Sequence, residues 1–204
     1  MKVSGKIYSC FIITKKGTNF KNLGIPYTII EPDVDESALS DLEPGLLVKE
    51  LSMLKASNVC KKVINWSDTY IISADTVVVF EDKVLGKPKD EEEAKNMLKT
   101  LSGKTHKVLT GFCVMEASTQ KATSKHVESE VTFKELSDEL IDDYVKSGEP
   151  LDKAGAYGIQ ELGSVIVKQI KGDYFNVVGL PVSSLFDVLL EDFSINLFHL
   201  RGRN

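Results

Sequence analysis

Arginine is almost absent from this chain of 204 residues, because the only two, Arg201 and Arg203, lie within its last four positions. Every other fixed cation is a lysine. Lysine is a flexible point charge, whereas the planar guanidinium of arginine binds carboxylates and phosphates through two parallel hydrogen bonds. Any phosphate-binding site upstream of residue 201 must therefore use lysine side chains, backbone amides or a metal ion.

Cysteine, histidine and long apolar runs are also scarce. The three cysteines fit neither a zinc-binding spacing nor a secreted disulfide framework, so we expect small buried side chains. The three histidines are scattered, which argues against a zinc site. The apolar runs are too short to span a bilayer and no signal-peptide cleavage pattern is evident, so we expect a cytoplasmic protein without a membrane partner. These residues are Cys10, Cys60, Cys113, His106, His126 and His199.

The charge balance argues against one class of partner. Lysine and arginine number 25 and aspartate and glutamate number 30, so the formal net charge is −5. We therefore expect no bulk electrostatic attraction to a nucleic acid polymer or an anionic membrane, although a local basic pocket is compatible with this charge. The length suits one domain with a substantial core.

Apolar periodicity predicts strands and helices that mix along the chain, without a repeat or a long linker. The predicted strands are residues 7–14, 27–30, 70–80, 84–85, 108–115, 125–133 and 164–170. The predicted helices are residues 19–23, 46–63, 90–101, 137–148 and 181–190. This order favours a single α/β or α+β domain over residues 1–204, with a frayed tail from about residue 196.

Residues 73–88, Ser-Ala-Asp-Thr-Val-Val-Val-Phe-Glu-Asp-Lys-Val-Leu-Gly-Lys-Pro, are the most informative segment. Asp75 lies inside an apolar strand, where an ionised carboxylate is costly unless it is paired or used. Lys87 precedes Pro88, which biases it to an extended conformation. An acid in a core strand followed by a lysine on a stiff turn indicates a site for a metal-bound, phosphate-bearing ligand. The alternatives are an aspartate that caps a loop and a solvated turn lysine.

The geometry of a strand limits how Asp75 can act. Side chains alternate between the two faces of a strand, so Asp75 shares a face with Ser73 and Val77 while Thr76 points the other way. For Asp75 and Thr76 to reach one ligand, we expect the strand to bulge or end there. Asp75 could then bind a metal, orient water or accept its proton.

Other segments add candidates for the same site. Asp33, Asp35 and Glu36 offer a second metal-binding carboxylate, with a solvated loop as the alternative. Lys55 lies near the apolar face of its helix, where it either serves a site or extends its charge to solvent. Gln160 ends a glycine-containing loop, and its amide both donates and accepts, which suits reading a base edge. An ordinary tight loop is the alternative there.

Several motifs occur in a fixed order along the chain. They are Leu-Gly-Ile-Pro (23–26), Leu51 to Ala56, Ser-Ala-Asp-Thr-Val-Val (73–78), Leu-Gly-Lys-Pro (85–88), Leu-Ser-Gly-Lys-Thr-His (101–106), Gly-Glu-Pro-Leu-Asp-Lys-Ala-Gly-Ala-Tyr-Gly-Ile-Gln (148–160) and Gly-Asp-Tyr-Phe-Asn-Val-Val-Gly-Leu-Pro (172–181). Each is modest alone, but the ordered set is specific. Together they resemble the Maf family of nucleoside triphosphate pyrophosphatases over roughly residues 12–192.

The resemblance implies an α/β fold in which helices flank a mixed twisted sheet, as in inosine-triphosphate-type pyrophosphatases. It implies hydrolysis of a nucleoside triphosphate to the monophosphate and pyrophosphate with Mg²⁺ or Mn²⁺. Family members are often dimers, so the resemblance also implies a homodimer. Thr76 and Gln160 match the positions that set base preference, and their identities resemble the branch that acts on dTTP and UTP rather than on 7-methyl-GTP.

The resemblance also assigns roles within the pocket. Asp75 matches the proton acceptor of the family. Lys55, Lys87 and Glu36 match pocket residues, and we expect Asp75 and Glu36 to hold the metal.

One segment departs from the family pattern. Family members usually carry Ser-x-Ser-Pro-Arg-Arg after the first strand, whereas residues 11–16 here read Phe-Ile-Ile-Thr-Lys-Lys, so residues 1–16 are divergent. Lys15 and Lys16 keep the charge but lose the forked geometry, and we expect them to hold the triphosphate less tightly. Since about 1.4 kcal/mol of transition-state stabilisation is tenfold in rate, a weakened enzyme or an inactive nucleotide-binding or regulatory homologue is the alternative. A purely structural dimer partner is a third hypothesis.

Overall fold

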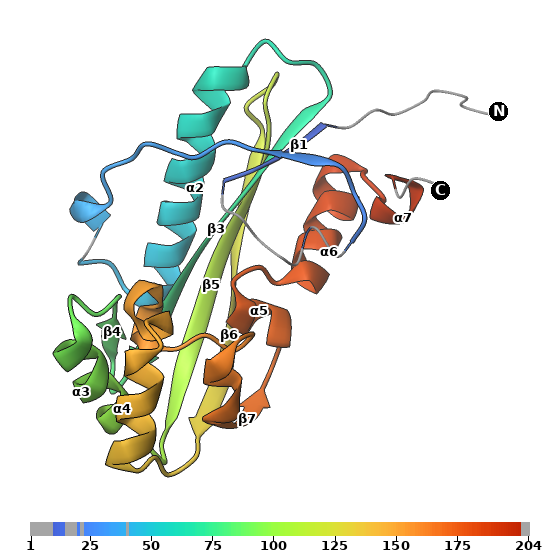
Figure 1. Ribbon diagram of the computed structural model, residues 1–204. Coiled ribbons are helices and arrows are strands. Elements are labelled where there is room, and N and C mark those ends of the chain that lie inside the picture. Colours follow the sequence, from blue (N-terminus) through green and yellow to red (C-terminus); the bar gives the residue numbers. More distant parts are fainter. Residues whose placement is uncertain (1–9, 15–19, 21–22, 40, 201–204) are drawn as a thin grey trace.

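A mixed β-sheet forms the centre of the molecule (Figure 1). The computed structural model describes residues 10–14, 20, 23–39 and 41–200. The strands are β1 (Cys10–Ile13), β2 (Tyr27–Ile29), β3 (Thr69–Phe80), β4 (Lys83–Leu85), β5 (Thr105–Glu116), β6 (Ala122–Phe133) and β7 (Val167–Lys171). Their order in the sheet is β2-β1-β3-β5-β6-β7, and β4 pairs with β3 outside this path.

Strand direction divides the sheet into two parts. β1 runs parallel to both β2 and β3, whereas β3, β5, β6 and β7 pair successively in antiparallel fashion, as does β4 with β3. Strands β3, β5 and β6 are each 12 residues long. Their many β-branched residues suit a pleated, largely buried surface. The sheet and its flanking helices confirm the predicted α/β class in a single domain.

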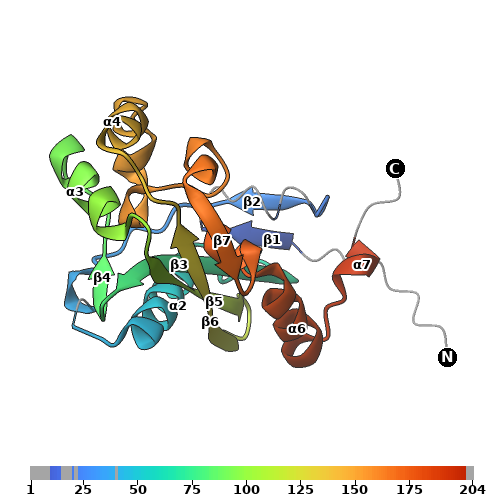
Figure 2. The ribbon, with the colours of Figure 1, turned by 90° about the horizontal axis from the view of Figure 1, so that it is seen from below.

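Helix α2 (Pro44–Val63) covers one face of β3 and β5 (Figure 2). Its buried residues, among them Val48 and Val59, pack with Ile71 and Val77, which are odd-numbered residues of β3. Gly111 of β5 lies directly beneath this helix, and an added Cβ would fall 2.2 Å from the carbonyl oxygen of Val48. The absence of a side chain at residue 111 therefore sets how closely α2 approaches the sheet.

Several shorter helices cover the opposite face. They are α3 (Glu91–Leu101), α4 (Asp138–Lys146), α5 (Tyr174–Val178) and α6 (Val182–Phe193). Val78 packs into a core that includes residues of α3 and α4, and Ile72 packs into one that includes residues of α6. In Figure 2, α2 and α4 lie on opposite sides of β3. Alternate residues of β3 therefore contribute to cores on different faces of the sheet.

Two predicted helix starts are confirmed in detail. Asp90 accepts the N–H of Glu93 at 2.8 Å at the start of α3, and Ser137 accepts the N–H of Leu140 at 3.2 Å at the start of α4. Such caps satisfy backbone donors that have no partner within the helix. The long helix begins at Pro44 rather than at residue 46, because proline is well suited to a first helical turn.

Three segments near the C-terminus differ from the prediction. The strand expected at residues 164–170 begins only at β7, because a 3₁₀ turn, Leu162–Val165, precedes it. The segment at 172–180, for which no helix was predicted, contains α5, whose first turn is capped by Asp173. The tail that was expected to fray includes α7 (Leu197–Leu200), and Leu197 is buried in the core beneath α6. Burial of apolar side chains thus orders this segment, although its local sequence gives little indication of a helix.

Two further expectations concern the cysteines and the lengths of the helices. Cys60 and Cys113 are buried free thiols, as expected of small core side chains. The side chain of Cys10 is outside the part of the chain that is described. Across the described ranges, no helix combines the length and the apolar character needed to cross a bilayer.

The edge of β3 that faces β1 and β4 contains a gap. β1 pairs with residues 69–72 of β3, and β4 pairs with residues 78–80. Among the described residues, no strand pairs with residues 73–77 on this edge. The last contact before the gap is the hydrogen bond that the Thr14 N–H donates to the Ile72 carbonyl at 3.2 Å. Asp75 lies at the middle of the gap.

Candidate active site

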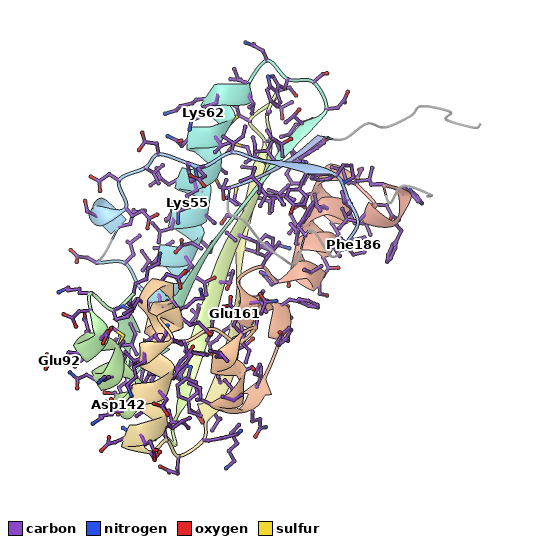
Figure 3. All side chains as sticks on the ribbon, viewed as in Figure 1. Lys55, Lys62, Glu92, Asp142, Glu161 and Phe186 are labelled. Carbon is purple, nitrogen blue, oxygen red and sulfur yellow. The ribbon has the colours of Figure 1, made fainter. Side chains whose placement is uncertain are left out.

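The gap in the edge of β3 opens into a cavity of about 660 Å³. Lys55 and Glu161, which are labelled in Figure 3, line it from α2 and from the loop before β7. The cavity brings together six of the residues singled out from the sequence. They are Glu36, Lys55, Asp75, Thr76, Lys87 and Gln160.

Strand β3 neither bulges nor ends at Asp75, so that prediction was wrong. Asp75 pairs with Gly111 and Thr76 with Thr110 in an unbroken antiparallel register. The two side chains still line one cavity, because no described strand pairs with residues 73–77 on this edge and the cavity extends around it. The gap between β1 and β4 thus has the effect that was expected of a bulge.

Lys55 links two carboxylates from different segments. Its ammonium group pairs with Asp75 on β3 and lies 2.9 Å from Oε1 of Glu36. The side chains of Lys55 and Asp75 are 14% and 18% exposed, whereas that of Glu36 is 48% exposed. The Lys55–Asp75 pair is therefore largely withdrawn from water, and Glu36 closes it on the solvent side.

The environment of Lys55 keeps its charge. Burial opposes the charged form, but the Coulombic attraction of Asp75 and the contacts with Glu36 outweigh it and raise the pKa of Lys55 above its ordinary value. Lys55 is therefore a permanent cation at neutral pH. It fixes the position of the Asp75 carboxylate at the mouth of the gap.

A second group of charges comes from two loops. Lys87 follows β4, and the preceding carbonyl of Gly86 accepts the N–H of Gly155 at 3.0 Å, which ties the two loops together. Lys153 also lines the cavity, with its Nζ 2.6 Å from Oδ1 of Asp152. The charged lining residues are Glu31, Glu36, Asp75, Asp152, Glu161, Lys55, Lys87 and Lys153. Carboxylates thus outnumber ammonium groups in the described lining.

Thr76 lies on the opposite face of β3 from Asp75. Its Oγ1 is 2.9 Å from Oγ1 of Thr110 on β5. Gly179, with a φ of 110°, passes so close that an added Cβ would lie 3.2 Å from the Thr76 hydroxyl. Val177 and Val178 add apolar lining beside it. This part of the cavity is therefore less charged than the part around Lys55.

Glu149 holds the segment that carries Gln160. Its carboxylate accepts the N–H groups of Leu162 and Gly163 at 2.9 and 3.0 Å. It also accepts the hydroxyl of Tyr144 at 2.8 Å. One carboxylate on the far side of the loop thus fixes the backbone just beyond Gln160.

Similarity to known proteins identifies the family. A family model described as "Maf-like protein" matches residues 18–192. The chain belongs to the Maf-like family. Two relatives named dTTP/UTP pyrophosphatase, from Thermoanaerobacter sp. (strain X514) and Clostridioides difficile (strain 630), are 48% and 45% identical to it. The alignments cover 86% and 88% of this chain and 91% of each relative.

A solved structure overlaps part of this Maf-like chain. The Ham1 protein of Staphylococcus aureus gives a TM-score of 0.39 at 14% sequence identity. The overlap covers 61% of this chain and 71% of that one.

The two lysines that stand in place of the family's arginine pair cannot be located relative to the cavity. Lys15 and Lys16 lie outside the described residues. The match to the Maf-like family begins at residue 18, so it too leaves them out. Their contribution to triphosphate binding stays a prediction.

Asp75 and Glu36 are the two carboxylates that were expected to hold a divalent cation. Where the structure describes the chain, no group of three or more His, Cys, Asp or Glu side chains could hold a metal ion. Mg²⁺ needs no such group, because one or two carboxylates bind it together with substrate phosphates and water. Asp75 and Glu36 converge on one ammonium group, so their placement fits this mode of binding.

Sequence patterns did not reveal the residues that support the Maf-like site from behind. Glu149 and Tyr144 belong to a predicted loop and a predicted helix face, and neither carries a local sign of its contacts. Thr110 is one of many β-branched residues in β5. Asn176 lies in the segment at 172–181, and its complete burial became evident only from the structure.

We expect Glu149→Gln to weaken nucleotide binding by the Maf-like protein more than it slows turnover. An amide has one accepting oxygen instead of two, so a backbone N–H beyond Gln160 loses its partner. Leaving such a donor unsatisfied costs about 1–3 kcal/mol, and KM for a nucleoside triphosphate should rise by about fivefold or more while kcat changes less. Steady-state kinetics check this. Glu139→Gln, an exposed change on α4, is the matched control, and an unchanged KM for Glu149→Gln would contradict the prediction.

Proposed function

We propose that this chain hydrolyses dTTP or UTP to the nucleoside monophosphate and pyrophosphate. The observation that carries the proposal is the Asp75 carboxylate, held by Lys55 at an open strand edge inside a large cavity. The Maf-like family and the names of the relatives support the same activity. These names also do not favour the inactive nucleotide-binding alternative.

In the proposed reaction, Asp75 orients a water molecule and accepts its proton as the water oxygen attacks the α-phosphorus. The bond between the α-phosphorus and the oxygen that bridges to the β-phosphate breaks, and pyrophosphate leaves. Lys55 and Lys87 line the cavity and neutralise the charge that develops on the phosphate oxygens. Lys15 and Lys16 are proposed to add to this neutralisation.

A divalent cation, Mg²⁺ or Mn²⁺, belongs to the proposal. Asp75 and Glu36 would hold it, and it would supply charge neutralisation and Lewis-acid polarisation at the phosphates. The described lining of the cavity is net acidic, and a triphosphate is strongly anionic. Cations must therefore accompany the substrate for the two to associate.

Thr76 and Gln160 are the proposed base-reading residues. Both line the cavity. Gln160 offers a donor and an acceptor on one planar amide, which matches the alternating groups on the edge of a pyrimidine. The apolar lining near Thr76 suits the faces of a base.

Pyrophosphate release tests the proposal. The purified chain is incubated with dTTP, UTP, CTP, ATP or GTP in MgCl₂ or MnCl₂, and the products are separated. We expect dTTP and UTP to be converted fastest into equal amounts of monophosphate and pyrophosphate, and EDTA to abolish the reaction. Release of inorganic phosphate in place of pyrophosphate, or turnover of none of the triphosphates, would overturn the proposal.

The remaining proposals concern where the protein acts, what it binds and whether it forms a dimer. We propose that the protein acts in the cytoplasm on a free nucleotide, with no nucleic acid polymer or membrane as partner, because its net charge is −5. We also propose a homodimer, following the family resemblance. Light scattering of the purified chain at several concentrations measures that state directly.

A further inference from the structure

A line of hydrogen bonds runs from the cavity into the core behind Thr76. The Oγ1 atoms of Thr76 and Thr110 lie 2.9 Å apart. The hydroxyl of Thr110 donates to the backbone carbonyl of Asn176 at 2.8 Å. Thr110 and Asn176 are both fully buried, whereas Thr76 lines the cavity. The line thus connects one cavity-lining hydroxyl to two interior residues.

Asn176 is fixed by contacts on its side-chain amide and on its backbone carbonyl. Its Oδ1 accepts the N–H of Thr110 at 3.1 Å. Its Nδ2 donates to the carbonyl of Val108 at 2.9 Å and lies 3.0 Å from the hydroxyl of Ser129. Its carbonyl also accepts the N–H of Gly179 at 2.9 Å. The residue therefore cannot turn to offer Thr110 a different partner without losing several buried hydrogen bonds.

These contacts determine which way the protons point. A carbonyl can only accept, so the single hydroxyl proton of Thr110 goes to Asn176. Thr110 then has only lone pairs for Thr76, and the Thr76 hydroxyl must donate its own proton to Thr110. The hydroxyl of Thr76 has one proton and two lone pairs. With the proton committed to the interior, Thr76 presents only lone pairs to the cavity.

We propose that Thr110 and Asn176 are positioning residues that make Thr76 an obligate hydrogen-bond acceptor for the N3–H of uracil or thymine. The inference rests on the proposed function and deepens it, because it names the group on the base that is read. Uracil and thymine carry a proton on N3, between two carbonyl oxygens. Cytosine carries a lone pair on N3, which would meet the lone pairs of Thr76 in the same position.

The surroundings of Thr76 restrict other arrangements. The backbone of Gly179 passes close to the hydroxyl, and Val178 lines the cavity nearby. Gln160, whose amide both donates and accepts, lines the same cavity and can pair with either carbonyl neighbour of N3. Thr76 therefore supplies the fixed acceptor, and Gln160 supplies the adaptable partner.

The first test compares UTP with 3-methyl-UTP on the natural chain, which requires no variant. A methyl group replaces the N3 proton and leaves both carbonyl oxygens in place. We expect kcat/KM to fall by about tenfold or more, because the hydrogen bond is lost and a buried acceptor is left unsatisfied. Equal turnover of the two nucleotides would overturn the inference while leaving the proposed function intact.

The second test uses Thr110→Val, with Thr110→Ser as its matched control. Valine keeps the shape but removes the hydroxyl, so the proton of Thr76 is no longer directed inward. We expect the ratio of kcat/KM for UTP to that for CTP to fall by about fivefold or more in Thr110→Val and to stay near the natural value in Thr110→Ser. Structural damage alone would lower both rates together, so an unchanged ratio in Thr110→Val overturns the inference.

Calorimetry separates this inference from the proposed function. A chain that binds UTP more tightly than 3-methyl-UTP but does not hydrolyse either supports the reading of N3–H and contradicts the hydrolysis. A chain that hydrolyses UTP but binds both nucleotides equally supports the hydrolysis and contradicts the reading of N3–H.

Discussion

Asp75→Asn is expected to lower the turnover of dTTP or UTP by about 10²–10⁴-fold while the chain still folds. Asparagine has nearly the same shape as aspartate but cannot accept a proton from water at neutral pH. It also removes one of the two charges that hold the Lys55 ammonium group in place. The measurement is pyrophosphate release at saturating nucleotide, together with a thermal unfolding curve.

The control for this change is Asp187→Asn, which makes the same chemical substitution at an exposed position of α6. That variant should retain the natural rate. If Asp75→Asn is folded and as active as the natural chain, then Asp75 is not the proton acceptor. A loss of activity that accompanies a large drop in melting temperature would instead indicate a structural role for the Lys55 pair.

Gly111→Ala is expected to destabilise the fold by about 3 kcal/mol or more. The added methyl group would lie 2.2 Å from the carbonyl oxygen of Val48 and 2.7 Å from the backbone nitrogen of Lys49. These are backbone atoms of α2, so the whole helix must move away from the sheet. For a chain of this size the melting temperature should fall by roughly 6–12 °C.

The same displacement should also reduce activity, because α2 carries Lys55 towards Asp75. Gly86→Ala is the matched control, since no atom lies within 4 Å of a Cβ placed there. It should change the melting temperature by less than about 1–2 °C, as an unconstrained surface substitution does. A melting temperature for Gly111→Ala equal to that of the natural chain would show that α2 does not rest on the sheet as described.

Local patterns were sufficient for the long elements of this fold. Strand β3 was predicted within one residue of its observed ends, because a run of β-branched and apolar residues between polar turns has few other uses. The caps at Asp90 and Ser137 were predictable because a cap requires only residues that are close in sequence. The candidate site also depended on an anomaly that is visible in sequence, the carboxylate of Asp75 within an apolar strand.

Features that depend on distant contacts could not be predicted in this way. The gap beside Asp75 exists because β1 pairs with β3 only as far as Ile72 and β4 pairs with β3 only from Val78, and neither boundary has a local signal. The hydrogen bonds between Thr110 and Asn176 join residues that are 66 positions apart. The bulge expected at Asp75 was wrong for the same reason, since the argument considered one strand without its neighbours.

Thr76 and Asp75 are adjacent in the chain but project from opposite faces of β3, one towards α5 and the other towards α2. The hydroxyl of Thr76 continues into hydrogen bonds with Thr110 and Asn176, whereas the carboxylate of Asp75 contacts Lys55 of α2. Under the proposed roles, we expect substitutions around α5 to change which nucleotide is accepted more than they change the rate of hydrolysis. This arrangement allows descendants of one ancestral hydrolase to diversify their choice of nucleotide independently of their rate of hydrolysis.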